Sequence, residues 1–182
     1  MDELIDILDA DGNHTGMVLM KSEAHKKGLF HPSIHVWFYT ENGDVLIQKR
    51  GKHKDTHPNL WDVSVAGHVG AGEDIILSAM REVREEIGLT IQKRDLFKLG
   101  VFKYRHLHRT DLVDCEFHHT FLSRLKAPLK TLKMQETEVD DLALIPIHHY
   151  KKELAHKATA TKYVPYDPSY YEVVFRAIEK RL

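Results

Sequence analysis

The 182-residue chain is 42% hydrophobic and 29% charged, the balance of a globular domain that can bury a core. Its formal net charge of −1 excludes a general electrostatic attraction to a nucleic acid polymer or an anionic membrane. No apolar run approaches the roughly 20 residues that span a bilayer, and the acidic N-terminus lacks the pattern of a secretory signal. The single cysteine, Cys115, cannot form an internal disulfide, which fits a reducing compartment. We therefore expect one cytoplasmic domain across residues 1–182.

Apolar runs and turn residues predict the elements of the first half of the chain. Two short strands are expected around the turn Asp11-Gly12-Asn13, and Ser22 is a candidate N-cap for a short helix. Asn42-Gly43 between two apolar runs is a strong hairpin signal. The expected elements, in order, are strands 4–8 and 17–20, helix 22–27, strands 34–40 and 45–49, a histidine-rich loop 50–59 and strand 62–66.

The second half combines long strands with helices. A helix is expected to end at Gly88, which favours the left-handed conformation of a C-cap. A long antiparallel pair turns near Arg109-Thr110-Asp111. The expected elements are helix 74–87, strands 97–106, 112–122 and 142–145, and helices 147–156 and 170–182. Strands with helices on both faces predict an α/β sandwich with a mixed central sheet, which residues 1–32 precede as an N-terminal extension.

The most informative segment spans residues 67–89. On a helix each residue advances about 100°, so Glu85 lies about 60° to one side of Glu82 and Glu86 about 40° to the other. Carboxylates this close repel each other, and Mg²⁺, which also recruits substrate phosphates, removes that repulsion. The alternative is a solvated helix in which arginines pair with the glutamates. The fixed spacing across 23 residues favours the metal site.

This segment resembles the Nudix box at every defining position: Gly67, Glu73, Arg81, Glu82, Glu85, Glu86 and Gly88. The resemblance implies an α/β/α sandwich with a mixed central sheet. It also implies hydrolysis of a nucleoside diphosphate linked to another group, with Mg²⁺ or Mn²⁺ as the cofactor.

The same resemblance implies roles for single residues. Glu85 and Glu86 would be the principal metal ligands beside the Ala66 carbonyl, and Glu82 would be a ligand or the base that activates water. Glu73 and Arg81 would support the helix and loop, and Arg81 joins Glu82 and Glu85 in the expected catalytic set. A carboxylate from a later loop would add to the site, and two candidates stay open, Glu136 and Glu138.

The flanks resemble a narrower relative, the type I isopentenyl-diphosphate Delta-isomerases, over about residues 9–163. In that family histidines and a pair of alternating carboxylates form a second metal site, matched here by His25, His31, His68, Asp114 and Glu116. Mixed histidine and carboxylate ligation suits Mn²⁺ or Zn²⁺. The alternative for each histidine is a surface or capping residue, and whether this second site is occupied stays open.

The isomerase resemblance also implies substrate-binding residues. Lys21, Arg50 and Lys54 match positions that hold the diphosphate, and Tyr104 matches a catalytic tyrosine. The alternatives are a solvated basic face and a tyrosine that packs on the sheet.

Two residues depart from the isomerase pattern. Ala66 stands immediately before Gly67-His68, where the isomerases carry the thiol that moves protons on an allylic carbon. Glu82 stands where they carry a basic residue. Cys115 is a poor substitute for the thiol, because strand alternation turns it away from the face of Asp114 and Glu116. These departures favour hydrolysis over isomerisation.

We therefore expect a metal-dependent Nudix hydrolase that cleaves a diphosphate linkage in a small molecule. Isopentenyl-diphosphate isomerisation is the first alternative, and a non-catalytic diphosphate-binding module is the second. The expected partner is the small-molecule diphosphate, with no nucleic acid polymer and no membrane. A homodimer stays open, and no pattern identifies the base, sugar or prenyl group of the substrate.

Overall fold

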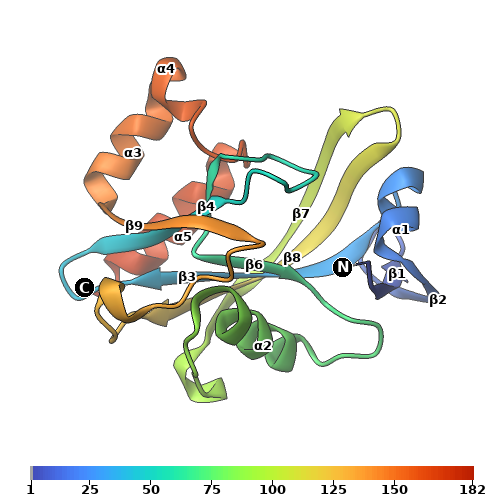
Figure 1. Cartoon of the computed structure of the whole chain (residues 1–182), viewed down its shortest axis with the longest axis horizontal. Helices are drawn as coiled ribbons and strands as arrows, with labels where there is room; N and C mark the ends of the chain where they lie inside the picture. The colour runs from blue at the N-terminus through green and yellow to red at the C-terminus, as the bar shows by residue number, and fades with distance from the viewer. Residues whose placement is uncertain (1) are drawn as a thin grey trace.

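The computed structural model describes residues 2–182, and a seven-stranded sheet forms its centre (Figure 1). Strand β3 (His31–Tyr39) runs parallel to β8 (Leu112–Arg124), which is antiparallel to β7 (Phe97–Arg109). On its other side β3 pairs antiparallel with β4 (Asp44–Arg50) and β6 (Val65–His68). Strands β5 (Trp61–Asp62) and β9 (Val139–Pro146) pair antiparallel with β4. The sheet is therefore mixed, as expected.

Helices cover both faces of this sheet (Figure 1). Helix α2 (Ile75–Ile87) packs on one face, and α3 (Ile147–Ala155) and α5 (Pro168–Glu179) pack on the other. The short helix α4 (Lys157–Ala160) and two 3₁₀ turns, η1 (Lys93–Asp95) and η2 (Leu129–Thr131), lie in the connections. This arrangement confirms the predicted α/β/α sandwich.

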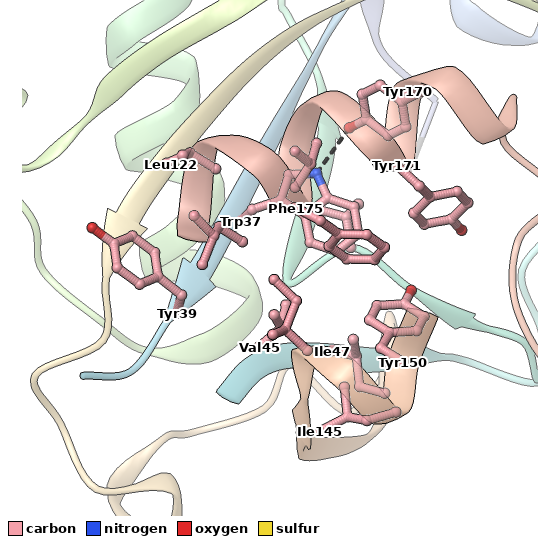
Figure 2. Close-up of a cluster of buried hydrophobic side chains, with 14 of the residues drawn as sticks. Trp37, Tyr39, Val45, Ile47, Leu122, Ile145, Tyr150, Tyr170, Tyr171 and Phe175 are labelled. Atoms are coloured by element: carbon pink, nitrogen blue, oxygen red, sulfur yellow. Dashed lines mark hydrogen bonds between the residues drawn. The ribbon is translucent and has the colours of Figure 1, made fainter. Parts of the chain in front are cut away.

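Side chains that alternate along β3 contribute to a core on each face. Toward α2 the strand presents three buried apolar residues, Ile34, Val36 and Phe38. Toward α5 it presents Trp37, whose Nε1 donates a hydrogen bond to Tyr170 Oη at 2.9 Å (Figure 2). A strand buried on both faces is normally apolar on both. Ser33 and His35, at the start of β3, break that pattern and mark the place of the site.

The sheet divides between β3 and β4, and Ser64 bridges the two parts. Strand β3 pairs with β4 at Tyr39 and Val45, while its first half pairs with β6. Ser64 Oγ accepts a hydrogen bond from the Phe38 N–H at 2.8 Å and donates one to the Leu46 carbonyl. The single strand expected over 62–66 is therefore wrong, because this bridge separates β5 from β6.

The division of the sheet lets helix α2 reach both parts. The Glu86 carboxylate accepts hydrogen bonds from Gln48 on β4 and from the backbone of Ala66 on β6. The helix itself begins after Asp74, whose side chain accepts hydrogen bonds from two backbone N–H groups at 2.9 and 3.1 Å. It ends at Gly88, which has a φ of 70°. Both ends match the sequence prediction.

The last helix differs slightly from its prediction. It begins at Pro168 rather than at residue 170, because Asp167 accepts a hydrogen bond from the Ser169 N–H and proline suits the first helical turn. It ends at Glu179 rather than at residue 182.

Residues 2–28 add a small layer beside β3 and β8. Strands β1 (Leu4–Leu8) and β2 (His14–Met20) form an antiparallel pair, and α1 (Lys21–Lys27) packs against β8. The predicted cap at Ser22 is wrong, because the helix starts one residue earlier and Ser22 Oγ donates to Asp2 at 2.7 Å instead. Across residues 2–182 we find no helix with the length and apolarity that crossing a membrane requires.

Candidate active site

The residues expected from the two resemblances meet at one cavity of about 230 Å³. All of them line it except four, His31, Glu73, Gly88 and Glu136. One part of the wall, here called the carboxylate end, consists of Glu82, Glu85 and Glu86 on α2. Another part, the histidine end, consists of His25, His31, His68 and Glu116, with His31 directly behind the lining.

Two carboxylates of the carboxylate end are withdrawn from solvent. Glu86 is 4% exposed, and its Oε2 accepts hydrogen bonds from Gln48 Nε2 at 2.9 Å and from the Ala66 N–H at 3.2 Å. Burial, followed by the nearby Glu82, raises the pKa of the Glu86 carboxyl to about 8. Burial also raises the pKa of Glu82 to about 7, although Arg81 opposes the shift. A divalent cation would stabilise the ionised forms, so these residues fit a hard metal ion.

Arg81 holds the carboxylate end in place. Its guanidinium contacts both oxygens of Glu73 at 3.0 and 2.9 Å, Glu82 Oε1 at 2.6 Å and Glu85 Oε2 at 3.2 Å. It also donates to the His68 carbonyl at 3.1 Å, and this hydrogen bond connects α2 to β6, the strand that carries His68. Because these partners occupy its donors, Arg81 braces the glutamates and is not free to contact a phosphate.

Gly67 gives Glu82 the space it occupies. A Cβ atom built on Gly67 would lie 2.1 Å from Glu82 Cδ, which is far inside van der Waals contact. The glycine at the start of the box therefore allows the strand and the glutamate to approach each other. Gly88 serves its own purpose at the other end, because it combines the left-handed C-cap conformation with close contact to Lys133.

The basic residues that we expect to bind the diphosphate all line the cavity, but their ion pairs hold them with different strength. Lys21 Nζ lies 3.3 Å from Glu3, and Lys54 pairs with Glu138. Both pairs are partly exposed, so either lysine can exchange its partner for a phosphate oxygen at little cost. Arg50 is more constrained, because its Nη1 lies 2.7 Å from the buried Asp62.

The two candidate glutamates of the later loop lie in different environments. Glu138 lines the cavity and holds Lys54, whereas Glu136 is exposed and lies outside the lining. Of the two, Glu138 is the carboxylate that can face a ligand bound in the cavity.

The histidine end brings its four donor atoms within 4.8 Å of one another. Its residues come from α1, β3, β6 and β8, and the parallel register places His31 opposite Glu116. Glu116 Oε1 lies 3.7 Å from His31 Nε2 and 3.6 Å from His68 Nε2. Asp114, the fifth expected ligand, lies beside this group rather than within it, with Oδ1 3.7 Å from His25 Nδ1.

The protonation states at the histidine end suit a transition metal. Burial lowers the pKa of His25 to about 3 and that of His68 to about 4, so both imidazoles are neutral at pH 7. Although burial opposes it, contact with His118, His31 and His68 holds the pKa of Glu116 well below its usual range. His68 Nε2 and Asp114 Oδ1 are buried without a hydrogen-bond partner among residues 2–182. Neutral imidazoles beside an ionised carboxylate fit Mn²⁺ or Zn²⁺.

Ala66, Cys115 and Tyr104 bear on the choice between the two reactions. Ala66 lines the cavity where the isomerases carry a thiol. Cys115 is buried outside the lining, and burial raises the pKa of its thiol. Tyr104 lines the cavity, and its Oη lies 3.3 Å from His57 Nε2. The structure therefore brings the tyrosine to the cavity but no thiol.

Several polar residues of the wall were not anticipated. His35 stacks on His118 with ring centroids 4.0 Å apart, and Ser33 Oγ lies 2.8 Å from His118 Nδ1. Their signal in the sequence is a period-two run of polar residues inside buried strands, as in Ser33 and His35. Tyr166, whose Oη donates to Asp62 at 2.8 Å, comes from a connecting segment and has no such signal.

Known proteins resemble this chain along its length. The NUDIX domain family matches residues 29–166. Nudix hydrolase 3 of Arabidopsis thaliana is 33% identical over 99% of this chain, which spans 24% of the length of that protein. An uncharacterized Nudix hydrolase of Clostridium acetobutylicum is 30% identical, with 97% of each chain covered.

Similar proteins also include isomerases, and solved structures share the fold. The isopentenyl-diphosphate Delta-isomerase of Serratia proteamaculans is 31% identical over 67% of this chain and 66% of its own. A crystal structure from Deinococcus radiodurans is similar in fold, with a TM-score of 0.71 at 19% identity and 98% of both chains covered. The chain belongs to the Nudix hydrolase family, in a branch that resembles the type I isopentenyl-diphosphate isomerases.

Proposed function

We propose that the protein is a metal-dependent hydrolase that cleaves a diphosphate linkage in a small molecule of the nucleoside diphosphate-X type. The observation that carries this proposal is the complete carboxylate end, in which Glu86 is buried, Glu82 is half-buried, and burial raises the pKa of both. Such an arrangement destabilises a metal-free helix and suits one that binds a cation.

The chain's own residues divide the work of this reaction. Glu85, Glu86 and the Ala66 carbonyl are the proposed ligands of Mg²⁺ or Mn²⁺, with Glu138 as the carboxylate of the later loop. When bound, the cation supplies charge neutralisation of the diphosphate and a lowered pKa of water. Glu82 is the proposed proton acceptor, because its pKa of about 7 matches neutral conditions. Lys21 and Lys54 are proposed to contact phosphate oxygens.

We also propose that the histidine end binds a second metal ion, Mn²⁺ or Zn²⁺. Its support is the preformed set of three imidazoles and the ionised Glu116 beside the same cavity. In this proposal residues 1–32 are an N-terminal extension of a single functional domain over 1–182, because Glu3, Lys21 and His25 line the cavity.

Isopentenyl-diphosphate isomerisation is the second candidate function. The histidine end and Tyr104 favour it, and so does the resemblance to the Serratia isomerase. Ala66 opposes it, because no thiol lines the cavity. A non-catalytic diphosphate-binding module is disfavoured by the complete carboxylate end.

The test is metal-dependent turnover of a panel of diphosphates that includes nucleoside diphosphate sugars, dinucleoside polyphosphates and isopentenyl diphosphate. With Mg²⁺ or Mn²⁺, we expect release of phosphate, pyrophosphate or nucleoside monophosphate from at least one compound. Glu85→Gln and Glu86→Gln should each abolish that release and leave the circular dichroism spectrum unchanged. Glu136→Gln is the matched control, because this exposed glutamate lies outside the cavity lining.

Each remaining outcome favours a named alternative. Conversion of isopentenyl to dimethylallyl diphosphate by the unmodified protein would replace hydrolysis by isomerisation. Binding of a diphosphate without any turnover would favour the binding module. Turnover that survives both glutamate substitutions would show that the carboxylate end is not the site.

A further inference from the structure

A third group of donor atoms lies at the rim of the cavity, apart from the two ends already described. It consists of His57, His106 and His108, whose candidate ligand atoms all lie within 4.8 Å of one another. The three rings form a triangle, with centroids 4.8 Å apart for His57 and His106, 4.5 Å for His57 and His108, and 4.6 Å for His106 and His108. No residue is shared with the histidine end.

Two separate parts of the chain build this triangle. His106 and His108 alternate along β7 and so point to one face of the strand, the face that also carries Tyr104. His57 comes from the loop 51–60 between β4 and β5, which reaches toward β7 (Figure 1). His57 has a φ of 46°, in the left-handed region that few residues other than glycine adopt. The backbone therefore adopts a strained conformation at the residue that meets β7.

The surroundings prepare the imidazoles to bind a metal. His108 Nε2 lies 2.8 Å from Asp114 Oδ2, so this nitrogen donates to the carboxylate and Nδ1 stays available as a ligand. A carboxylate that orients a histidine in this way is a regular companion of zinc ligands. Burial, followed by His108 and His106, lowers the pKa of His57 to about 4, which leaves its imidazole neutral at pH 7. The side chain of His106 makes no hydrogen bond within residues 2–182.

Three imidazoles that converge from two elements match the donor set of zinc with an open fourth position. We propose that His57, His106 and His108 bind a Zn²⁺-like transition-metal ion at the cavity rim, distinct from the two metals of the proposed function. The ion fastens loop 51–60, which carries Lys54, to the β7–β8 hairpin. Because His57 also lines the cavity, the proposed ion would lie beside it. This inference does not depend on which reaction the protein catalyses.

Binding of Zn²⁺ alone to the full-length, chelator-treated protein tests the proposal. In equilibrium dialysis with metal analysis, the parent should bind one more Zn²⁺ ion per chain than His106→Gln binds. His57→Asn should lose the same equivalent, since asparagine tolerates the left-handed conformation and lacks an imidazole. His53→Gln is the matched control, because His53 is an exposed histidine of the same loop and should bind as the parent does.

Zn²⁺ bound at the histidine end must be distinguished from Zn²⁺ bound by His57, His106 and His108. In a His31→Gln background, the Zn²⁺ equivalent that remains should disappear when His106→Gln is added. Hydrogen exchange gives a second readout, since Zn²⁺ should slow exchange across residues 51–60 in the parent and in His53→Gln but not in His106→Gln. Equal stoichiometry in the parent, His106→Gln and His57→Asn would overturn the proposal. Protection of the loop that persists in both variants would also overturn it.

Discussion

The two ends of the cavity present opposite kinds of donor. At the carboxylate end, burial raises the pKa values of Glu82 and Glu86, so in the metal-free protein these two residues retain protons near neutral pH. At the histidine end, His25 and His68 are neutral imidazoles beside Glu116, whose pKa is held low, so these donors are ready at neutral pH. A hard cation at the first end must displace protons, whereas a borderline metal at the second end need not. In the proposed function, the two ends of the cavity would therefore select different metals by the chemistry of their donor atoms.

The largest expected effect separates the two ends by activity. If Glu82 accepts the proton, Glu82→Gln should lower kcat by about 10²–10⁴, the range for loss of a general base. His31→Gln, at the histidine end, should lower kcat for hydrolysis by a smaller factor. Initial rates of product release measure both variants, with Glu136→Gln as the control. A greater loss of kcat in His31→Gln than in Glu82→Gln would contradict the assignment of Glu82 as the proton acceptor.

The next effect concerns stability of the metal-free protein. Between pH 4.5, the usual pKa of a glutamate, and about 8, the folded state keeps the proton on Glu86 while the unfolded state releases it. The free energy of unfolding therefore falls as pH rises, by about 1.4 kcal/mol per pH unit within that window. Below pH 4.5 both states hold the proton and this loss is absent.

Glu86→Gln removes this titration. Both hydrogen bonds to Glu86 reach the same oxygen, Oε2, so the side-chain carbonyl of a glutamine can accept both. In urea titrations with chelator present, the variant should be more stable than the parent at pH 8, and the difference should shrink toward pH 5. A difference that grows toward low pH would contradict the raised pKa of Glu86. Glu136→Gln should show no such trend, since that residue is exposed.

A smaller effect tests the geometry between strand and helix. Gly67→Ala places a Cβ against Glu82 and should cost about 1–3 kcal/mol of unfolding free energy, as overpacking does. It should also lower kcat, since Glu82 must move. Gly70→Ala is the matched control, because its Cβ would meet the end of the Glu73 side chain at 3.3 Å. Equal losses in the two alanine variants would show that Gly67 is not specifically required beside Glu82.

The two ends also differ in how far the sequence predicts them. The carboxylate end lies on one helix, so the helical period alone groups Glu82, Glu85 and Glu86. The C-cap predicted at Gly88 is a local signal too and is confirmed, whereas Asp74, expected as the first helical residue, is the N-cap. The same locality explains the confirmed hairpins.

The histidine end depends on long-range pairing. His31 meets Glu116 because β3 runs parallel to β8, and no local pattern encodes a register between residues this far apart in the sequence. Only the resemblance to the isomerases grouped these residues, and it did not separate Asp114 from the others. The rim triangle had a local signal in His106 and His108, but its third member, His57, belongs to a loop. The split strand at Ser64 was missed because a side-chain bridge replaces ladder hydrogen bonds there.

The smallest expected effect lies at Ala66, between the two ends. Ala66→Cys should change the free energy of unfolding by about 1 kcal/mol at most, because the side chain is half-buried at the cavity wall. The new thiol should react with a colorimetric disulfide reagent in the folded protein, whereas Cys115 in the parent should not, since it is buried and its thiol pKa is raised.

Hydrolysis should persist in Ala66→Cys, because the proposed role of residue 66 at the carboxylate end belongs to its backbone carbonyl. A reactive Cys115 in the folded parent would remove the main objection to isomerisation. An unreactive thiol at position 66 would mean that this side chain does not face the cavity. If position 66 reacts and hydrolysis persists, the residue serves the carboxylate end through its backbone alone. Its side chain then matters only for the isomerase reaction, which alanine cannot support.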